Sequence, residues 1–403
     1  MTSRADSVVH GAGHDVVRRA PGKLYIAGEY AVVEPGHRAV LVAVDRFITV
    51  HAAVSSTPSS TGPSPADGRT GTIRSQLYAT GLRPWRRRPQ DGLAEAVSGD
   101  DDYVISAIRV VEALVSEAGG RLRPFDLDVS SELDEADGRK LGLGSSSAVT
   151  VATVRAVAGL YGLPVDDLGV YKLAMLASDA IQPIGSGGDI AASAVTGWVA
   201  YTSPDRTWLR EARRRAEAAG SLSDLVEADW PGLSVRRLAA PSVRLQVGWT
   251  GTPASTPALV SGVQAGAHGA DDAYAVFLRD SQDCLGSLTT AIEDDDVARI
   301  MRQVTRNREL LGRLSRISGR VIETPALTRL VEIAREYGAA AKSSGAGGGD
   351  CGIALCPPAT DLAALRSAWE SAGIRPLDLA VHTHDSSTAP TDTPPDAPAK
   401  VSS

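Results

Sequence analysis

The spacing of hydrophobic and polar positions changes along the chain, which predicts a mixture of strands and helices. Short apolar or alternating runs bounded by glycine, proline or aspartate are typical of strands. They occupy residues 23–27, 31–33, 39–44, 47–54, 125–131, 198–201, 243–249, 351–356 and 376–382. Apolar residues recur with helical spacing in a second set of segments, residues 103–118, 148–157, 165–180, 208–219, 270–292, 296–318, 326–337 and 360–372.

Polar stretches rich in Ser, Thr, Pro, Gly and Asp lie between and outside these runs. Such stretches cannot bury enough apolar surface to form a core. We therefore expect residues 1–17 and 385–403 to be disordered tails, and residues 55–72 to form an exposed loop. Residues 221–238 are expected to connect two larger units.

Composition narrows the classes of function. With 403 residues the chain is long enough for two or three domains. Its net charge of −7 comes from both signs, without the basic field that nucleic-acid binding needs. No apolar run reaches the length of a membrane span, and the start lacks the apolar segment of a secretory signal. Three cysteines without metal-like spacing fit a reduced cytosol. We expect a cytoplasmic protein that binds neither nucleic acid nor membrane.

The glycine- and serine-rich segment before the apolar run 148–157 is the strongest chemical signal. It reads Gly142, Leu143, Gly144, Ser145, Ser146 and Ser147. Unpaired backbone N–H groups and the helix dipole make the start of a helix suitable for an anion, and hydroxyl groups there can reach a metal. The segment matches neither a Walker A motif nor the dinucleotide fingerprint, because no Gly-Lys-Ser/Thr follows and Ser147 occupies the third glycine position. It predicts a phosphate-binding loop of another kind.

Glycine-rich segments also occur near residues 22 and 346. A single such loop is more often a plain turn than a ligand site. Three in one chain, two of them joined to serines and a lysine, favour function. Only five lysines stand among 41 basic residues, so a lysine beside a glycine-rich segment draws attention to a specific role.

These three segments resemble the three motifs of the GHMP kinases. Residues 20–33 (APGKLYIAGEYAVV) resemble the first motif, residues 142–148 (GLGSSSA) the second and residues 342–352 (KSSGAGGGDCG) the third. They occur in the order and at the spacing of that family, over about residues 18–383. Glu29-Tyr30, Gly-Trp-Thr-Gly at 248–251 and the third motif are most similar to the phosphomevalonate kinases of this family.

The resemblance implies transfer of the γ-phosphoryl group of ATP to the phosphate of 5-phosphomevalonate, with Mg²⁺ as cofactor. Lys23 and Asp189 would be the catalytic residues, and residues 142–147 would bind ATP. Ser146 is the first choice for a hydroxyl ligand of Mg²⁺. The simpler alternatives are an exposed strand lysine at position 23 and a helix cap at Asp189.

The acceptor would lie against the first and third motifs. The resemblance places Glu29, Tyr30, Lys342, Ser343, Ser344 and Gly345 there. Glu29 and Tyr30 could instead be residues at the edge of the core, and 342–344 a plain turn. An acceptor with phosphate and carboxylate groups needs cations, for which Arg83 and the arginines at 86–88 are candidates, although such charge runs are usually solvated.

Two features concern the mechanism. The acceptor phosphate is largely deprotonated at pH 7, so we expect Asp189 to orient Lys23 and the substrate rather than to accept a proton. Mevalonate and homoserine kinases hold Mg²⁺ with a glutamate on the preceding helix, whereas this chain has Ser178 with Asp179 beside it. Either Asp179 substitutes, or ATP, serine and water hold the metal, which Mg²⁺ tolerates and which we favour.

The implied architecture is an α/β (α+β) protein with the GHMP kinase fold. An N-terminal domain, residues 18–205, would resemble domain 2 of ribosomal protein S5, and a C-terminal domain, residues 240–384, would be ferredoxin-like. The active site would lie between them. A monomer or a homodimer is compatible with the sequence. The alternatives are mevalonate kinase or another small-molecule GHMP kinase, and a non-catalytic GHMP-fold ligand sensor.

Overall fold

The computed structural model describes residues 15–54, 70–76, 78, 80–135, 139–183, 185–251, 256–267 and 271–383. The expectation of disorder for most of both tails lies outside these residues, as does most of the expected loop 55–72. Residues 71 and 72 of that loop belong instead to the strand Gly71–Ser75. Residues 16 and 17, assigned above to a tail, belong to the first strand.

An antiparallel-rich sheet forms the base of the N-terminal domain. In the described part of the chain it has eight strands, in the order β5-β4-β3-β6-β2-β7-β8, with β1 paired to β2. The strands are β1 (Val16–Ala27), β2 (Arg38–Val54), β3 (Gly71–Ser75), β4 (Leu82–Arg87), β5 (Ala94–Ala96), β6 (Phe125–Ser131), β7 (Trp198–Thr202) and β8 (Ser234–Leu238). The sheet therefore continues past residue 205, the predicted end of this domain.

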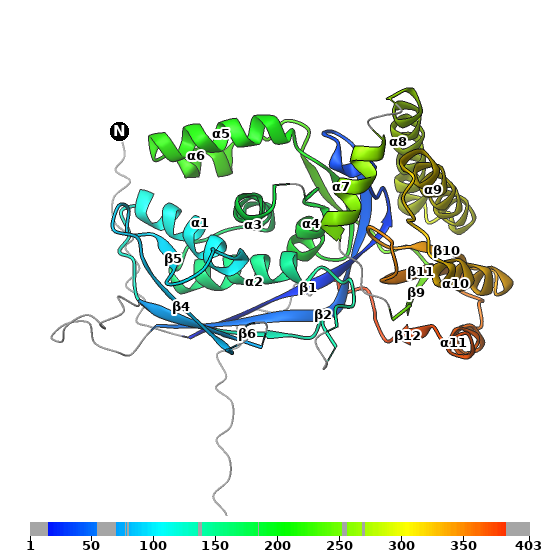
Figure 1. Ribbon diagram of the computed structural model, residues 1–403, viewed down its shortest axis with the longest axis horizontal. Coiled ribbons are helices and arrows are strands. Elements are labelled where there is room, and N and C mark those ends of the chain that lie inside the picture. The colour runs from blue at the N-terminus through cyan, green and yellow to red at the C-terminus, as the bar shows by residue number, and fades with distance from the viewer. Residues whose placement is uncertain are drawn as a thin grey trace, which may run out of the picture.

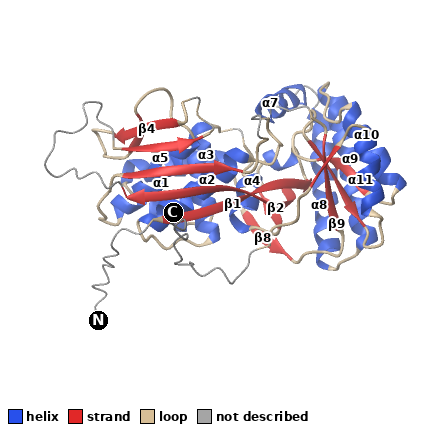
Figure 2. Cartoon of the chain, turned by 90° about the horizontal axis from the view of Figure 1, so that it is seen from below, coloured by secondary structure: helices blue, strands red, loops and turns tan. Residues whose placement is uncertain are grey.

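Helices cover one face of this sheet, and Figure 2 shows the molecule from the side of the strands. They are α1 (Tyr103–Glu117), α2 (Ser145–Leu160), α3 (Asp167–Ile181) and α4 (Gly188–Val195), with α5 (Arg206–Ala219) and α6 (Leu222–Glu227) farther from the sheet (Figure 1). Helix α2 packs on β1 and β2 as well as on α1 and α3. Its sequence is apolar on nearly every side because it lies at the centre of this layer.

The C-terminal domain has a four-stranded antiparallel sheet in the order β10-β11-β9-β12. Its strands are β9 (Arg244–Trp249), β10 (Ala340–Ser343), β11 (Cys351–Cys356) and β12 (Arg375–Leu377). The helices are α7 (Thr256–Ala267), α8 (Asp271–Glu293), α9 (Val297–Ser318), α10 (Pro325–Glu336) and α11 (Leu362–Ser371). Strand, helices, two strands, helix and strand follow in the order of a ferredoxin-like domain, as expected.

Three local predictions differ from the structure. Residues 31–33 form a 3-10 helix rather than a strand, because Gly28 and Tyr30 take positive φ values of +97° and +64° and turn the chain. Residues 39–44 and 47–54 form one strand, in which Asp45 and Arg46 are extra residues of a bulge opposite Pro21 and Gly22. The segment 221–238 is more than a connector, since it holds α6 and β8.

The end of the described chain returns to the N-terminal domain. After the short strand β12, His382 donates a backbone hydrogen bond to Ala43 (2.9 Å), and Val381 bridges Val44 on β2. The predicted last strand, 376–382, is therefore divided between the two domains. This return ties the C-terminal sheet to the strand next to β1.

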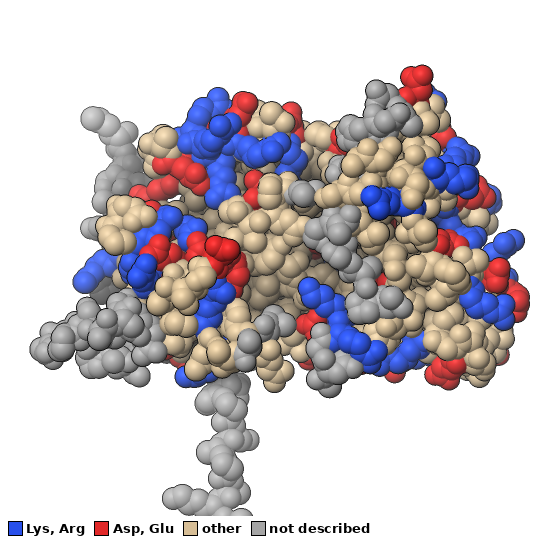
Figure 3. Space-filling view, in the orientation of Figure 1, with Lys and Arg blue, Asp and Glu red and all other residues tan. Residues whose placement is uncertain are grey.

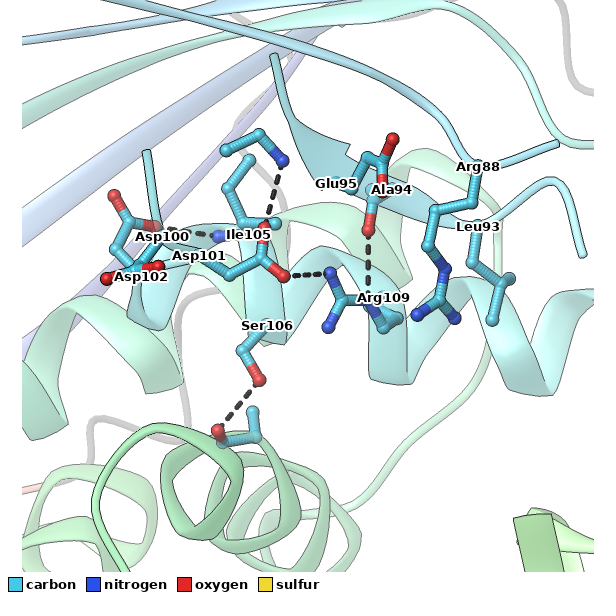
Figure 4. A network of polar contacts seen from close by, with 12 residues as sticks. Arg88, Leu93, Ala94, Glu95, Asp100, Asp101, Asp102, Ile105, Ser106 and Arg109 are labelled. Carbon is cyan, nitrogen blue, oxygen red and sulfur yellow. Dashed lines mark hydrogen bonds and ion pairs between the residues drawn. The ribbon is translucent and has the colours of Figure 1, made fainter. Parts of the chain in front are cut away.

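A network of polar contacts fixes the start of α1 (Figure 4). Arg109 donates to the carbonyl of Ala94 on β5 (2.9 Å) and pairs with Asp101. Ser106 donates to a carbonyl of α3 at 2.8 Å. These contacts position Tyr103, the first residue of α1, which lines the cavity described next.

Candidate active site

A cavity of about 700 Å³ opens between the two domains. Residues from all three glycine-rich segments line it, together with the starts of α1, α4 and α5. The lining includes Lys23, Tyr25, Glu29, Tyr30, Tyr103, Lys140, Gly142, Leu143, Gly144, Ser145, Ser146, Ser147, Asp179, Ser186, Asp189, Arg206, Ser344, Gly345, Ala346 and Asp350. Segments more than 300 residues apart in sequence thus share one site.

The phosphate-binding loop and Lys23 form one packed unit. Lys23 donates from its backbone to Leu143 (2.8 Å) and from its ammonium to the carbonyl of Gly142 (3.2 Å). Gly144 precedes α2 in the left-handed conformation, with φ of +81°. A Cβ atom there would lie 2.8 Å from Lys23 Cε, so the glycine makes room for the lysine side chain.

The three serines begin helix α2 and point its positive end into the cavity. The first hydrogen bond of the helix runs from Ala148 N to Gly144 O (3.0 Å), so the N–H groups of the serines have no partner within the helix. Ser146 is exposed, Ser145 is half-buried and Ser147 is buried. The exposed Ser146 suits an oxygen ligand for a metal better than Ser147, which lines the cavity but is only 5% exposed.

Asp189 lies in the first turn of a second helix, α4, which also begins at the cavity. One of its carboxylate oxygens accepts a hydrogen bond from Ile190 N (3.1 Å). The hydroxyls of Tyr25 and Ser186 lie 3.0 Å apart beside it. Burial and then the negative charge of Asp189 raise the pKa of Tyr25, and the same two causes raise the pKa of Tyr103. Both tyrosines therefore keep their protons and can donate hydrogen bonds.

Within the described residues, no ion pair joins Lys23 to Asp189, although both line the cavity. The only hydrogen bond of the Lys23 ammonium there is the one to Gly142. The role of Asp189 in orienting Lys23 stays a prediction.

The acceptor residues predicted from the first and third motifs divide into two groups. Glu29, Tyr30, Ser344 and Gly345 line the cavity. Lys342 and Ser343 do not, because their side chains are buried behind the wall, at 0% and 2% exposure. Their assignment to direct substrate contact stays a prediction that this placement does not favour.

Sequence reasoning missed two cations of the site. Among the described residues that line the cavity, the positive charges are Lys23, Lys140 and Arg206. Lys140 is exposed and stands two residues before Gly142. Lysine is scarce in this chain, so a lysine beside a glycine-rich segment was a signal that could have identified it. Arg206, at the start of α5, carried no such signal.

Arg206 also answers the question raised by Asp179. The two side chains form an ion pair and are 12% and 6% exposed. The guanidinium further donates to the carbonyl of Pro183 (3.1 Å) and to that of Gly185. Asp179 is thus already neutralised by a cation, and Arg206 holds the segment that leads to Ser186 and Asp189.

The arginine cluster at 83–88 lies outside the cavity, on and just after β4. Arg87 pairs with the fully buried Glu112, Arg86 with Glu95 and Arg83 with Asp102. These arginines connect β4 to neighbouring elements and do not line the cavity, so acceptor binding by them stays a prediction that this placement does not favour.

The described residues contain neither a side-chain cluster suited to a metal ion nor a helix suited to span a membrane. No group of three or more His, Cys, Asp or Glu side chains there is arranged to hold a metal ion. No helix in that part of the chain has the length and apolar character to cross a membrane. On the face shown in Figure 3, basic and acidic side chains are intermixed, with basic ones at the upper left lying over α5.

Comparisons with known proteins identify the family of the chain. The family model for the GHMP kinases N terminal domain matches residues 102–197, and that for GHMP kinases C terminal matches residues 288–375. A phosphomevalonate kinase of Streptomyces sp. (strain CL190) is 45% identical over 90% of this chain and 96% of its own.

Two solved structures share the whole fold. The Streptococcus pneumoniae phosphomevalonate kinase in complex with phosphomevalonate and AMPPNP has a TM-score of 0.74 and 30% identity, over 91% of this chain and 99% of its own. The Lin0012 protein from Listeria innocua has a TM-score of 0.81 and 33% identity, over 92% and 98%. The resemblance inferred from the three motifs is therefore confirmed.

Proposed function

The chain belongs to the GHMP kinase family, and we propose that it transfers the γ-phosphoryl group of ATP to the phosphate of 5-phosphomevalonate, giving 5-diphosphomevalonate and ADP. The observation that carries the reaction class is the convergence of Lys23, the phosphate-binding loop and Asp189 on one cavity. The acceptor follows from the 45% identity to a phosphomevalonate kinase along almost the whole chain.

The step needs little covalent chemistry from the protein. An oxygen of the acceptor phosphate attacks the γ-phosphorus, and the bond from that phosphorus to the β-bridging oxygen breaks with its electron pair going to ADP. A phosphomonoester has a second pKa of about 6 and is largely a dianion at pH 7, so no proton has to be removed. Catalysis then rests on positioning the two phosphates and on neutralising their charge.

Lys23 is placed for this neutralisation. Its ammonium donates a hydrogen bond to Gly142 of the phosphate-binding loop. Tyr25, two residues along the same strand, lines the part of the cavity that we assign to the acceptor. A cation between two anionic phosphates lowers their repulsion and stabilises the charge that develops in the transition state. The positive ends of α2 and α4 add to the same effect.

Lys140 offers a second cation at the loop, and Arg206 a third whose two terminal nitrogens already bind Asp179 and two backbone carbonyls. Lys140 is exposed in the cavity wall and can reach an anion directly. Arg206 instead orients the segment that precedes Asp189. We therefore assign direct phosphate contact to Lys23 and Lys140, and a supporting role to Arg206.

The residues present fit Mg²⁺, which prefers oxygen ligands and keeps several waters. The exposed Ser146 and the carboxylate of Asp189 are two candidate oxygen ligands in the cavity, whereas Asp179 is paired with Arg206. When bound, the ion would neutralise charge on the ATP phosphates. This favours a metal held mainly by nucleotide, serine and water.

The proposal is tested by measuring ADP formation with mevalonate, phosphomevalonate and diphosphomevalonate as separate acceptors. We expect turnover with phosphomevalonate alone. Turnover with mevalonate would establish the alternative of a mevalonate kinase. Binding of all three without ADP would establish a ligand sensor. The cytoplasmic location and a monomeric or homodimeric state stay predictions.

A further inference from the structure

At the cavity wall, an ion pair joins the two domains, with Glu29 in the wall and Lys342 behind it. Glu29 lies in the turn that follows β1, and Lys342 lies on β10 of the C-terminal sheet. The Lys342 ammonium donates to a carboxylate oxygen of Glu29, and the two side chains are 0% and 2% exposed. The ammonium also donates to the carbonyl of Ser343 at 2.5 Å.

We propose that Glu29 and Lys342 form a positioning pair that fixes the third glycine-rich loop, residues 344–349, against β1 and so sets its distance from Lys23. Lys342 would act on catalysis through this loop and would not touch the substrate. The kinetic part of the proposal rests on the proposed kinase function, and the structural part does not.

A contribution to stability is a weak reason for such a pair. Two charges buried in a medium of low polarity lose their hydration, and an apolar pair of similar size is often at least as stable. Moreover, the second carboxylate oxygen of Glu29 is buried without a hydrogen-bond partner in the described structure. What the pair does supply is a directional link between the turn after β1 in one domain and strand β10 in the other.

The contacts next to the pair show what the link holds. The oxygen of Glu29 that binds Lys342 also accepts from the backbone N–H of Gly345, at 3.4 Å. Tyr30 donates from its hydroxyl to the carbonyl of Ala346 at 2.5 Å. The first residues of the loop are thus tied to the residues that end the first motif.

A third tie runs from the loop to β1 itself. The hydroxyl of Ser344 accepts from Tyr25 N (2.9 Å) and donates to Tyr25 O (3.1 Å), two residues along the strand from Lys23. Farther along, Cys351 donates to the carbonyl of Leu141 at 3.0 Å, just before the phosphate-binding loop. The third loop and the strand after it are therefore held against β1 near Lys23 and against the start of the phosphate-binding loop.

The chemistry of the side chain agrees with a positioning role. An ammonium is a compact point charge that can donate to a carboxylate and a carbonyl from one small buried volume, whereas a guanidinium is a broad planar fork. Lysine stands here in a chain in which only five of 41 basic residues are lysine. The loop residues Ser344, Gly345 and Ala346 line the cavity, and Lys342 does not.

The test compares Lys342→Met, Glu29→Gln and the double variant with wild type. Lys172→Met is the matched control, because Lys172 is also buried, at 5% exposure, and donates to carbonyls of Val226 and Ala228 at 2.8 Å, away from the cavity. The readouts are melting temperature, kcat per nucleotide-binding site, and hydrogen exchange of the amides of residues 343–350.

We expect Lys342→Met to lower kcat by about 10²-fold, the effect of a displaced catalytic geometry, and to speed exchange of the 343–350 amides. The double variant removes both charges, so its melting temperature should recover relative to Lys342→Met while kcat stays low. Lys172→Met should lower the melting temperature without changing kcat or exchange in the loop.

A wild-type kcat in the folded Lys342→Met protein would overturn the proposal, as would recovery of kcat in the double variant. If Lys342→Met does not fold, the double variant and Glu29→Gln decide by the same criteria. The exchange measurement needs no acceptor. It therefore decides the structural claim even if wild type turns over no phosphomevalonate, a result that contradicts only the proposed function.

Discussion

The ammonium of Lys23 lies 3.2 Å from the carbonyl oxygen of Gly142, so the proposed catalytic lysine is held by the loop that is proposed to bind ATP. The backbone of the same lysine donates to Leu143 at 2.8 Å. This contact makes the position of the cation depend on the loop. It also means that nucleotide binding and charge stabilisation share one local structure.

Lys23→Met should lower kcat by about 10²–10³-fold, the usual cost of removing one donor that stabilises charge in a transition state. Steady-state kinetics with phosphomevalonate and ATP measure this. Arg46→Met, which removes an exposed cation of β2, is the control and should retain wild-type kcat. A Lys23→Met enzyme with nearly full activity would exclude the assigned role.

Gly144→Ala should abolish most activity, whereas Gly162→Ala should not. Both glycines have positive φ, +81° and +65°, so both substitutions cost about 1–2 kcal/mol of stability. Only at Gly144 does the new Cβ meet the lysine, since nothing lies within 4 Å at Gly162. Melting temperatures should fall alike, and kcat should separate the two variants. Equal kcat values would show that the packing of Lys23 on the loop is unimportant.

Asp189→Asn should reduce turnover and leave the acid limb of the pH–rate profile in place. That limb is expected to follow the acceptor phosphate, whose second pKa is about 6, rather than a protein base. The profile of kcat/KM is measured for both enzymes between acid and neutral pH. Loss of a base-like pKa together with almost all activity would identify Asp189 as a general base instead.

The three thiols should be unreactive in the native protein. Burial raises the pKa of Cys351 to about 12 and those of Cys284 and Cys356 to about 11. These native pKa values lie above the pKa of an exposed thiol, which is about 8.5. The contribution of the buried thiols to the free energy of unfolding is therefore complete below about pH 8.5 and is lost as the pH rises above it.

Titration with a thiol reagent at pH 8 checks this, with protein unfolded in denaturant as the control. Slow reaction of native protein and fast reaction of all three thiols after unfolding are expected. Fast labelling of any thiol in the folded state would contradict the buried placement. Unfolding free energies measured at increasing pH should decline above about pH 9.

Much of the fold could be predicted from the period of apolar residues. The segment 103–118 is apolar at helical spacing and forms α1, and the run 351–356 forms the fully buried strand β11. Pairing between distant strands was beyond such reasoning. The bulge at Asp45 and Arg46 depends on the pairing of this strand with Pro21 and Gly22 of β1, which are distant in sequence.

The site was predictable where chemistry follows a local motif. Lys23, the loop at 142–147 and Asp189 do line one cavity. Arg206 could not be found, because its role depends on Asp179 and two loop carbonyls that only the fold brings together. Lys342 belongs to the third motif, but its side chain is buried behind the cavity wall. This could not be predicted, because a sequence does not show which side chains of a motif face the ligand.

Phosphorus NMR of a reaction mixture of the enzyme, Mg²⁺, ATP and phosphomevalonate tests the central claim most directly, because it shows where the phosphoryl group goes. The account predicts that the phosphomonoester resonance of the acceptor is replaced by the coupled pair of a diphosphate monoester, in equal amount to ADP. ADP formed together with inorganic phosphate, or with a second phosphomonoester on an intact acceptor, would contradict transfer to phosphate.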